Sequence, residues 1–150
     1  MSTPQPIIRA PLDLGPRVWG TETVVALGPG YLGKVLRQRA GAAGGLQYHQ
    51  QKHETHHLVS GEAKVEYDDG TGALVSAILT AGQSVMIPPG TVHRVTAITD
   101  CVFFETSSPH FNDRVRVESD YDQPDTGGLR TTSVPLMIQD WDFLVGNQKG

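Results

Sequence analysis

Glycine and proline interrupt this chain so often that long helices are excluded over most of its length. The 17 glycines and 10 prolines recur between short runs rich in Val, Ile, Leu, Phe and Thr, which are the residues that favour β-strands. The segment VEYDDGTGALV predicts a hairpin, because its Asp-Gly pair tolerates the positive φ angles of a tight turn. We predict strands at Thr21–Leu27, Gly33–Arg39, Leu46–Gln51, Glu54–Ser60, Glu62–Asp68, Ala73–Leu79, Ser84–Ile87, His93–Ala97 and Cys101–Thr106.

These strands define the expected fold class and domain limits. No stretch of about 12 residues combines helical periodicity with helix caps, and short strands at this spacing predict an all-β closed barrel or sandwich. Residues 1–16 contain four prolines in a polar setting and are expected to form an extended arm. The barrel is expected over residues 17–121, followed by a linker and C-terminal extension at 122–150. Within that extension, 122–133 is expected to be a mobile linker, whereas 134–145 regains apolar character and is expected to pack on the barrel or on a second subunit.

Length and composition narrow the function classes. A chain of 150 residues fits one domain and can bury a core without disulfides. Its net charge of −4 argues against a nucleic-acid partner, and Lys and Arg form no run that would bind a membrane surface. The single cysteine, Cys101, fits a reducing compartment. We find neither a signal-peptide pattern nor an apolar run of about 20 residues, so a soluble cytoplasmic protein is expected.

Histidines gather around one glutamate in the segment LQYHQQKHETHHLVSG. His49, His53, His56 and His57 surround Glu54 there. A further histidine, at position 93, follows a Pro-Pro-Gly turn. Imidazole and carboxylate groups together bind borderline divalent metals. The sequence therefore predicts a metal site.

Strand alternation indicates which of these side chains meet, because successive side chains point to opposite faces. His49 and Gln51 share a face, and a bulge near Lys52-His53 is needed to bring Glu54 beside them. Beyond the bulge, Glu54 and His56 point inward and His57 outward. The turn at 88–90 directs His93 back into the barrel. The expected cluster is His49, Glu54 and His93, with Gln51 and His56 near it.

Two spaced blocks of the chain resemble the motifs of the cupin family. Gly45-x3-His49-x-Gln51-x2-Glu54-x6-Gly61 resembles the first motif, and Gly82-x5-Pro88-x-Gly90-x2-His93 resembles the second. The chain is also similar to the cupin domain of type II mannose-6-phosphate isomerase/guanylyltransferase proteins and related small sugar-pathway cupins. That similarity rests on RVWG at 17–20, LQYH at 46–49, SVMIPPGTVHR at 84–94 and DRVRVESDY at 113–121. The resemblance spans roughly residues 17–121.

This resemblance implies a cupin double-stranded β-helix, a jelly-roll barrel that commonly forms homodimers. It implies that His49, Glu54 and His93 bind a divalent transition metal (Zn, Fe, Mn or Ni), with Gln51 as a weaker, neutral ligand. Gln51 stands where the family pattern usually has a second histidine, and Ala97 stands where the second motif usually has asparagine. Two imidazoles and one carboxylate would leave positions open for water or substrate. The alternative is a barrel that has lost its metal together with that histidine.

The leading functional hypothesis is a metal-dependent enzyme acting on a sugar or sugar phosphate, as an isomerase or epimerase. Its catalytic residues would be His56, acting as a proton-transferring base, and Glu54. One alternative is a non-heme iron dioxygenase, since the same ligand set suits oxygen activation. Another is a non-catalytic sugar-binding module, which the glutamine at position 51 favours.

Several other polar or aromatic residues have weaker expected roles. Lys34, Arg37, Arg39 and Arg94 are candidates to bind a phosphate or carboxylate, although cations on strands usually face water. Glu105 either orients the site or lies at the barrel mouth, and the sequence leaves both possibilities open. We expect His53 and His57 to face solvent and Trp19 and Trp141 to pack, and we assign His110 no role.

Overall fold

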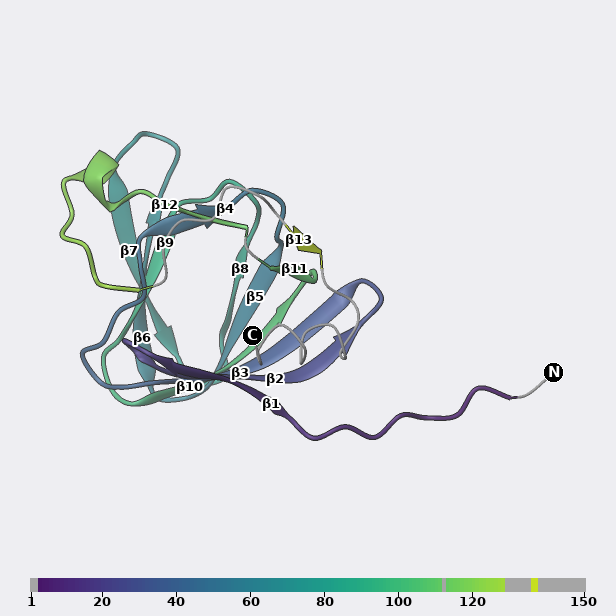
Figure 1. Cartoon of the computed structure of the whole chain (residues 1–150). Coiled ribbons are helices and arrows are strands. Elements are labelled where there is room, and N and C mark those ends of the chain that lie inside the picture. Colours follow the sequence, from purple (N-terminus) through teal and green to yellow (C-terminus); the bar gives the residue numbers. More distant parts are fainter. Residues whose placement is uncertain (1–2, 112, 129–135, 138–150) are drawn as a thin grey trace.

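In the computed structural model, two antiparallel sheets face each other across the interior of the molecule (Figure 1). The structure describes residues 3–111, 113–128 and 136–137. The larger sheet has six strands in the order β1-β2-β3-β10-β5-β8. Their bounds are β1 Leu12–Arg17, β2 Gly20–Gly28, β3 Tyr31–Gln38, β10 Cys101–Ser107, β5 Glu54–Ser60 and β8 Ser84–Ile87.

The second sheet has five strands in the order β12-β4-β9-β6-β7. Their bounds are β12 Arg114–Arg116, β4 Gln47–His49, β9 His93–Ala97, β6 Glu62–Asp68 and β7 Leu74–Thr80. A small two-stranded sheet pairs β11 (His110–Phe111) with β13 (Leu136–Met137), and a single 3-10 turn, η1, covers Glu118–Tyr121. The described residues contain no α-helix. The expected all-β double-sheet fold is therefore confirmed.

All nine predicted strands are present, and four of them (β5, β6, β8 and β9) have the predicted bounds. The Asp-Gly hairpin is also confirmed, with β6 and β7 paired from Glu62↔Thr80 to Asp68↔Leu74. The sequence did not predict β1 or β12. The pairing of β1 shifts register between Asp13 and Pro16, and β12 has only three residues, so neither shows clear alternation.

The apolar core lies between the sheets at one end of the strands, and a polar pocket follows it along the same inward faces. Leu58 and Phe103 are almost fully buried in the core. Cross-strand register places Phe103 opposite both Leu36 and Leu58. Two residues further along β10, Glu105 lies opposite Lys34 of β3 and His56 of β5. His56 precedes Leu58 by two residues, so both point to the same face of β5. One row across three strands is therefore apolar, and the neighbouring row is charged.

The segments that flank the barrel differ in part from expectation. Residues 3–11 carry no regular structure and lead away from the sheets, but β1 begins at Leu12, inside the predicted arm (Figure 1). Residues 122–128 lie within the predicted mobile linker, yet they contact the barrel. Gln123 accepts a hydrogen bond from Arg94, and Asp125 accepts one from Arg116. The rest of the extension, apart from β13, lies outside the described residues.

No helix in the described part of the chain is both long and apolar enough to cross a membrane.

Candidate metal centre

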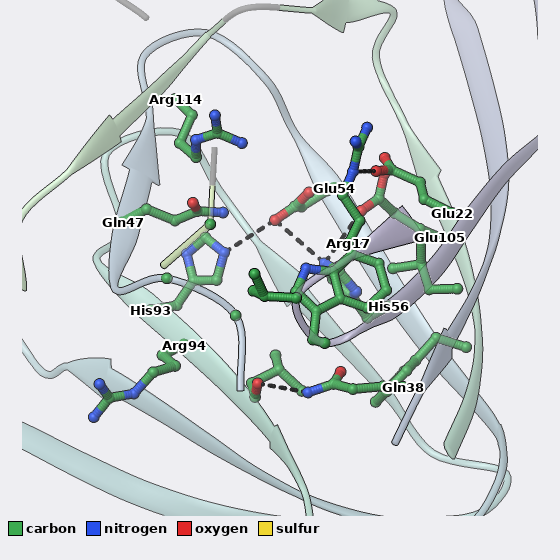
Figure 2. Close-up of a pocket in the computed structure, with 18 of the residues that line it drawn as sticks. Arg17, Glu22, Gln38, Gln47, Glu54, His56, His93, Arg94, Glu105 and Arg114 are labelled. Carbon is green, nitrogen blue, oxygen red and sulfur yellow. Dashed lines mark hydrogen bonds and ion pairs between the residues drawn. The ribbon is translucent and has the colours of Figure 1, made fainter. Parts of the chain in front are cut away.

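A cavity of about 380 Å³ opens between the two sheets and contains the candidate site. Strands of both sheets contribute to its wall, and Figure 2 shows charged side chains pointing into it from several directions. Trp19 and Phe103 form part of the apolar wall, where Trp19 packs against the core as predicted. A cavity of this size can hold a small polar molecule.

Three of the predicted ligands converge in this cavity from three strands. His49 ends β4, Glu54 begins β5 and His93 begins β9, and all three are buried. Oε1 of Glu54 lies 3.3 Å from Nε2 of His49 and 3.1 Å from Nε2 of His93. Adjacent ligands on one metal ion with bonds of about 2.1 Å are about 3.0–3.4 Å apart. The three atoms could therefore bind a single ion with little movement.

The surroundings of the two imidazoles favour metal binding. Nδ1 of His93 is 2.9 Å from the carbonyl oxygen of Thr91, so a proton on Nδ1 would leave the lone pair of Nε2 directed at Glu54. Both ring nitrogens of His49 are buried without a hydrogen-bond partner. Burial lowers the pKa of His49, outweighing the opposing effect of Glu54, and this favours the neutral form that binds metals. The donor set thus fits a borderline divalent ion such as zinc or iron.

A second polar group adjoins the ligands and shares Glu54 with them. Nε2 of His56 lies 3.3 Å from Oε1 of Glu54 and 3.5 Å from Oε1 of Glu105. The ammonium of Lys52 lies 2.9 Å from Oε2 of Glu54 and 3.3 Å from Oε2 of Glu105. The two carboxylates are therefore bridged by an imidazole on one side and by an ammonium on the other. Glu105, whose role the sequence left open, lies inside the barrel directly behind the predicted ligand.

The charged side chains in this group stabilise one another's ionised forms. Burial alone would raise the pKa of Glu54, but Lys52 and His56 hold it well below the usual range. Burial alone would lower the pKa of Lys52, but Glu105 and Glu54 raise it. For His56, burial is outweighed by Glu54 and Glu105, and its pKa is raised. Glu54 is thus ionised at neutral pH and available as an anionic ligand.

The structure corrects the predicted placement of Gln51 beside the cluster. Strand β4 ends at His49, and residues 50–53 form a loop in place of the predicted bulge, which leaves Gln51 exposed and Lys52 buried. The buried carboxylate of Asp113 explains this turn, because it accepts hydrogen bonds from three consecutive backbone N–H groups, those of residues 50, 51 and 52. Lys52 therefore points into the site where the sequence pattern predicts Gln51. The sequence pattern alone does not indicate that Lys52, and not Gln51, points into the site.

The structure also places the remaining predicted residues. His53 is exposed, as expected, and His57 is half-buried, with its Nδ1 2.8 Å from Oγ of Ser84. Arg37 and Arg39 are exposed and do not line the cavity. Two further predictions concern residues elsewhere. Nδ1 of His110 lies 2.7 Å from Oγ of Ser108, away from the cavity lining, and Trp141 lies outside the described residues.

Of the four predicted anion-binding cations, only Lys34 and Arg94 reach the cavity, and both contact carboxylates. Lys34 contacts Glu22 at 2.6 Å, and Arg94 contacts Glu66 at 3.1 Å. Sequence reasoning missed four other cations of the lining, namely Arg17, Lys52, Arg114 and Arg116. The alternation in Arg114-Val115-Arg116 is a signal that would have placed two of them on one face of a strand.

The two facing antiparallel sheets have the cupin fold. Residues 35–107 match a family profile described as "Cupin domain". A search of curated protein sequences finds no match. Many solved structures match this chain, and the three described next are 22% identical or less.

KdgF from Halomonas sp. is 22% identical, with a TM-score of 0.53 over 59% of this chain and 77% of its own. The capsular polysaccharide assembling protein CapF from Staphylococcus aureus is 20% identical, with a TM-score of 0.57 over 67% of this chain and 28% of its own. A mutant of the Bacillus subtilis oxalate decarboxylase OxdC is 20% identical, with a TM-score of 0.54 over 67% of this chain and 28% of its own. These likenesses establish the fold alone. They give no specific link to type II mannose-6-phosphate isomerases, so that part of the resemblance stays a prediction.

Proposed function

We propose that this cupin is a metal-dependent enzyme that moves a proton between carbons of a sugar or sugar phosphate, as an isomerase or epimerase. The observation that carries the proposal is the position of His56. Its Nε2 adjoins the predicted ligand Glu54 and the carboxylate of Glu105, and its side chain lines the cavity. A base beside an open metal site is the arrangement that proton abstraction next to a carbonyl requires.

Each group in the site has a separate task in this proposal. A bound metal ion would polarise the carbonyl of the substrate and stabilise the negative charge that develops on its oxygen. His56 would take the proton from one carbon and return it to the next, while Glu105 fixes the orientation of the imidazole. Phe103 packs edge-on against this imidazole, with ring centroids 6.0 Å apart, and restricts its rotation. Lys52 would keep Glu54 ionised through its contact with the far oxygen of that carboxylate.

The test is hydrogen exchange in heavy water. Full-length protein loaded with Zn²⁺, Mn²⁺ or Fe²⁺, and protein treated with EDTA, would be incubated with a panel of aldose and ketose phosphates. NMR would follow deuterium incorporation at C2 and the appearance of the isomer. We expect exchange only with metal, and a loss of about 10²–10⁴-fold in His56→Gln. His57→Gln is the matched control, because His57 lies on the same strand and faces the other way.

The same experiment can overturn the proposal. Exchange that is absent for every sugar and every metal would refute it, as would exchange that survives in His56→Gln.

One observation favours the non-catalytic alternative. The ammonium of Lys52 already neutralises part of the charge on Glu54, so the buried carboxylate is stabilised without a metal. A sugar-binding module would bind sugars equally well before and after chelation. Calorimetric titration of a sugar into both forms of the protein distinguishes the two functions.

A further inference from the structure

Arg17, the last residue of β1, lines the cavity from the larger sheet. It belongs to the RVWG segment at 17–20, which also contributes Val18 and Trp19 to the lining. Figure 2 shows its guanidinium next to the carboxylate of Glu22. Arg17 hydrogen-bonds to Glu22 and not to His56 or a predicted metal ligand, so the proton transfer proposed above does not use it. Arg17 is therefore a charged residue of the cavity without an assigned role.

Glu22 fixes the position of this guanidinium. The Nε of Arg17 donates a hydrogen bond of 2.8 Å to Oε2 of Glu22. The other oxygen of Glu22, Oε1, accepts a hydrogen bond of 2.6 Å from the ammonium of Lys34. Glu22 also lines the cavity, and on β2 it lies opposite Leu36 of β3. Because both oxygens of Glu22 are bonded, the carboxylate holds Arg17 in a defined orientation.

The two terminal nitrogens of Arg17 are available to a ligand. The bond to Glu22 uses only the Nε–H group, and within the part of the chain that the structure describes neither Nη atom has a hydrogen-bond acceptor. The side chain is 20% exposed, so most of it is removed from water. Donors in such surroundings cost free energy unless an acceptor satisfies them. The guanidinium also remains protonated at any pH that the protein meets.

We propose that the two Nη groups of Arg17 bind two oxygens of one anionic group of the substrate, a carboxylate or a phosphate. Parallel N–H donors on a planar guanidinium match paired oxygens on one carbon or phosphorus atom. The identity of the substrate as a sugar derivative rests on the proposed function. Arg17 lies on the larger sheet, whereas His49 and His93 lie on the smaller one. A bound sugar would therefore extend across the cavity, from its charged end at Arg17 to the candidate metal centre.

Calorimetric titration of the full-length protein tests the proposal, with and without added Zn²⁺. The probes are glucose, glucuronate, glucose 6-phosphate and inorganic phosphate, so that separate measurements distinguish a carboxylate from a phosphate. We expect at least one charged sugar to bind more tightly than glucose. Arg17→Gln should weaken that binding by about 10- to 100-fold, the loss expected for hydrogen bonds between charged partners. Arg17→Lys keeps the positive charge but not the paired donors, so its loss should be smaller but still measurable.

The matched control is Arg37→Gln, which removes an exposed arginine outside the cavity lining and should leave binding unchanged. If Arg17→Gln does not fold, the comparison of Arg17→Lys with the wild type decides, and equal affinity of the two for the charged sugar would overturn the inference. Charged sugars that bind no more tightly than glucose would also overturn it, as would their undiminished binding to folded Arg17→Gln, or binding of inorganic phosphate alone. None of these results bears on the proposed function, because the exchange experiment with His56→Gln decides it separately.

Discussion

Replacing Lys52 by methionine should make the site bind a divalent metal more tightly. The two oxygens of Glu54 have different neighbours: Oε1 lies near the three imidazoles, and Oε2 lies 2.9 Å from the ammonium of Lys52. A metal ion bound at Oε1 and the ammonium at Oε2 would therefore repel each other across one carboxylate. Methionine has a similar length and no charge, so Lys52→Met removes the repulsion without opening a large cavity.

The magnitude follows from the geometry. An ion bonded about 2 Å from Oε1 would lie on the order of 5 Å from Nζ. At that separation, charges of +2 and +1 repel by about 7 kcal/mol with an effective dielectric constant of about 20. Relaxation of the side chain and entry of water reduce this upper bound. A fifth of it, about 1.4 kcal/mol, still corresponds to a tenfold lower Kd.

The same substitution should destabilise the metal-free protein. Without the ammonium, Glu54 and Glu105 would be two buried carboxylates that repel each other, and the free energy of unfolding should fall by about 3–5 kcal/mol. Added metal should therefore raise the stability of Lys52→Met by more than that of the wild type. Urea unfolding with and without Zn²⁺, and competition of the protein with a coloured chelator, measure the two effects.

Lys64→Met is the matched control, because Lys64 lies on β6 with its ammonium 3.8 Å from Glu66 and its side chain 41% exposed. A surface pair of this kind contributes little to stability, so the metal affinity of Lys64→Met should equal that of the wild type. Folded Lys52→Met that binds Zn²⁺ no more tightly than the wild type would refute the reasoning.

Three further predictions concern stability. Burial would raise the pKa of Glu22, but Lys34 and Arg17 lower it to about 2, against 4.5 for the free side chain. Its stabilising contribution is therefore present above pH 4.5 and lost as the pH falls from 4.5 toward 2. Urea unfolding across this window should show a smaller decline in Glu22→Gln, and an identical decline would contradict the assignment. Asp113→Asn should lower the free energy of unfolding by about 2–3 kcal/mol, because an amide cannot accept all the backbone hydrogen bonds of residues 50–52, and it should weaken Zn²⁺ binding. Asp120→Asn, at an exposed position, is its control, and unchanged stability of Asp113→Asn would count against the role of this carboxylate. Leu58→Ala should cost about 2–5 kcal/mol, whereas Val59→Ala, at a side chain that is 53% exposed, should cost far less; similar losses for the two would show that the inward face of β5 is wrongly assigned.

The sequence predicted which side chains alternate between the two faces of each strand. This alternation placed much of the candidate site. On β5 it correctly placed Glu54 and His56 inside and His57 toward the other face. The Pro-Pro-Gly turn likewise gave the position of His93 at the start of β9. These predictions succeed because the side-chain period of a strand is a local property that the chain carries in any fold.

Outside the regular strands, the structure could not be predicted from the sequence. The loop after β4 turns Lys52 inward because the carboxylate of Asp113, about sixty residues later in the chain, accepts hydrogen bonds from its backbone. No local pattern around Gln51 indicates that partner. The sequence therefore predicts the three side chains that converge at the candidate site, but it predicts the wrong neighbour for them.

Cross-strand register also brought together residues that the sequence did not predict to be neighbours. The row that joins Lys34, Glu105 and His56 exists because β10 pairs with β3 on one side and with β5 on the other. Arg114 reaches the centre because the three-residue strand β12 pairs with β4. The sequence by itself determined which side chains face inward along each predicted strand, because that depends on backbone geometry alone. The tertiary structure decided which inward side chains become neighbours, because register and loop direction are set by hydrogen bonds between distant segments.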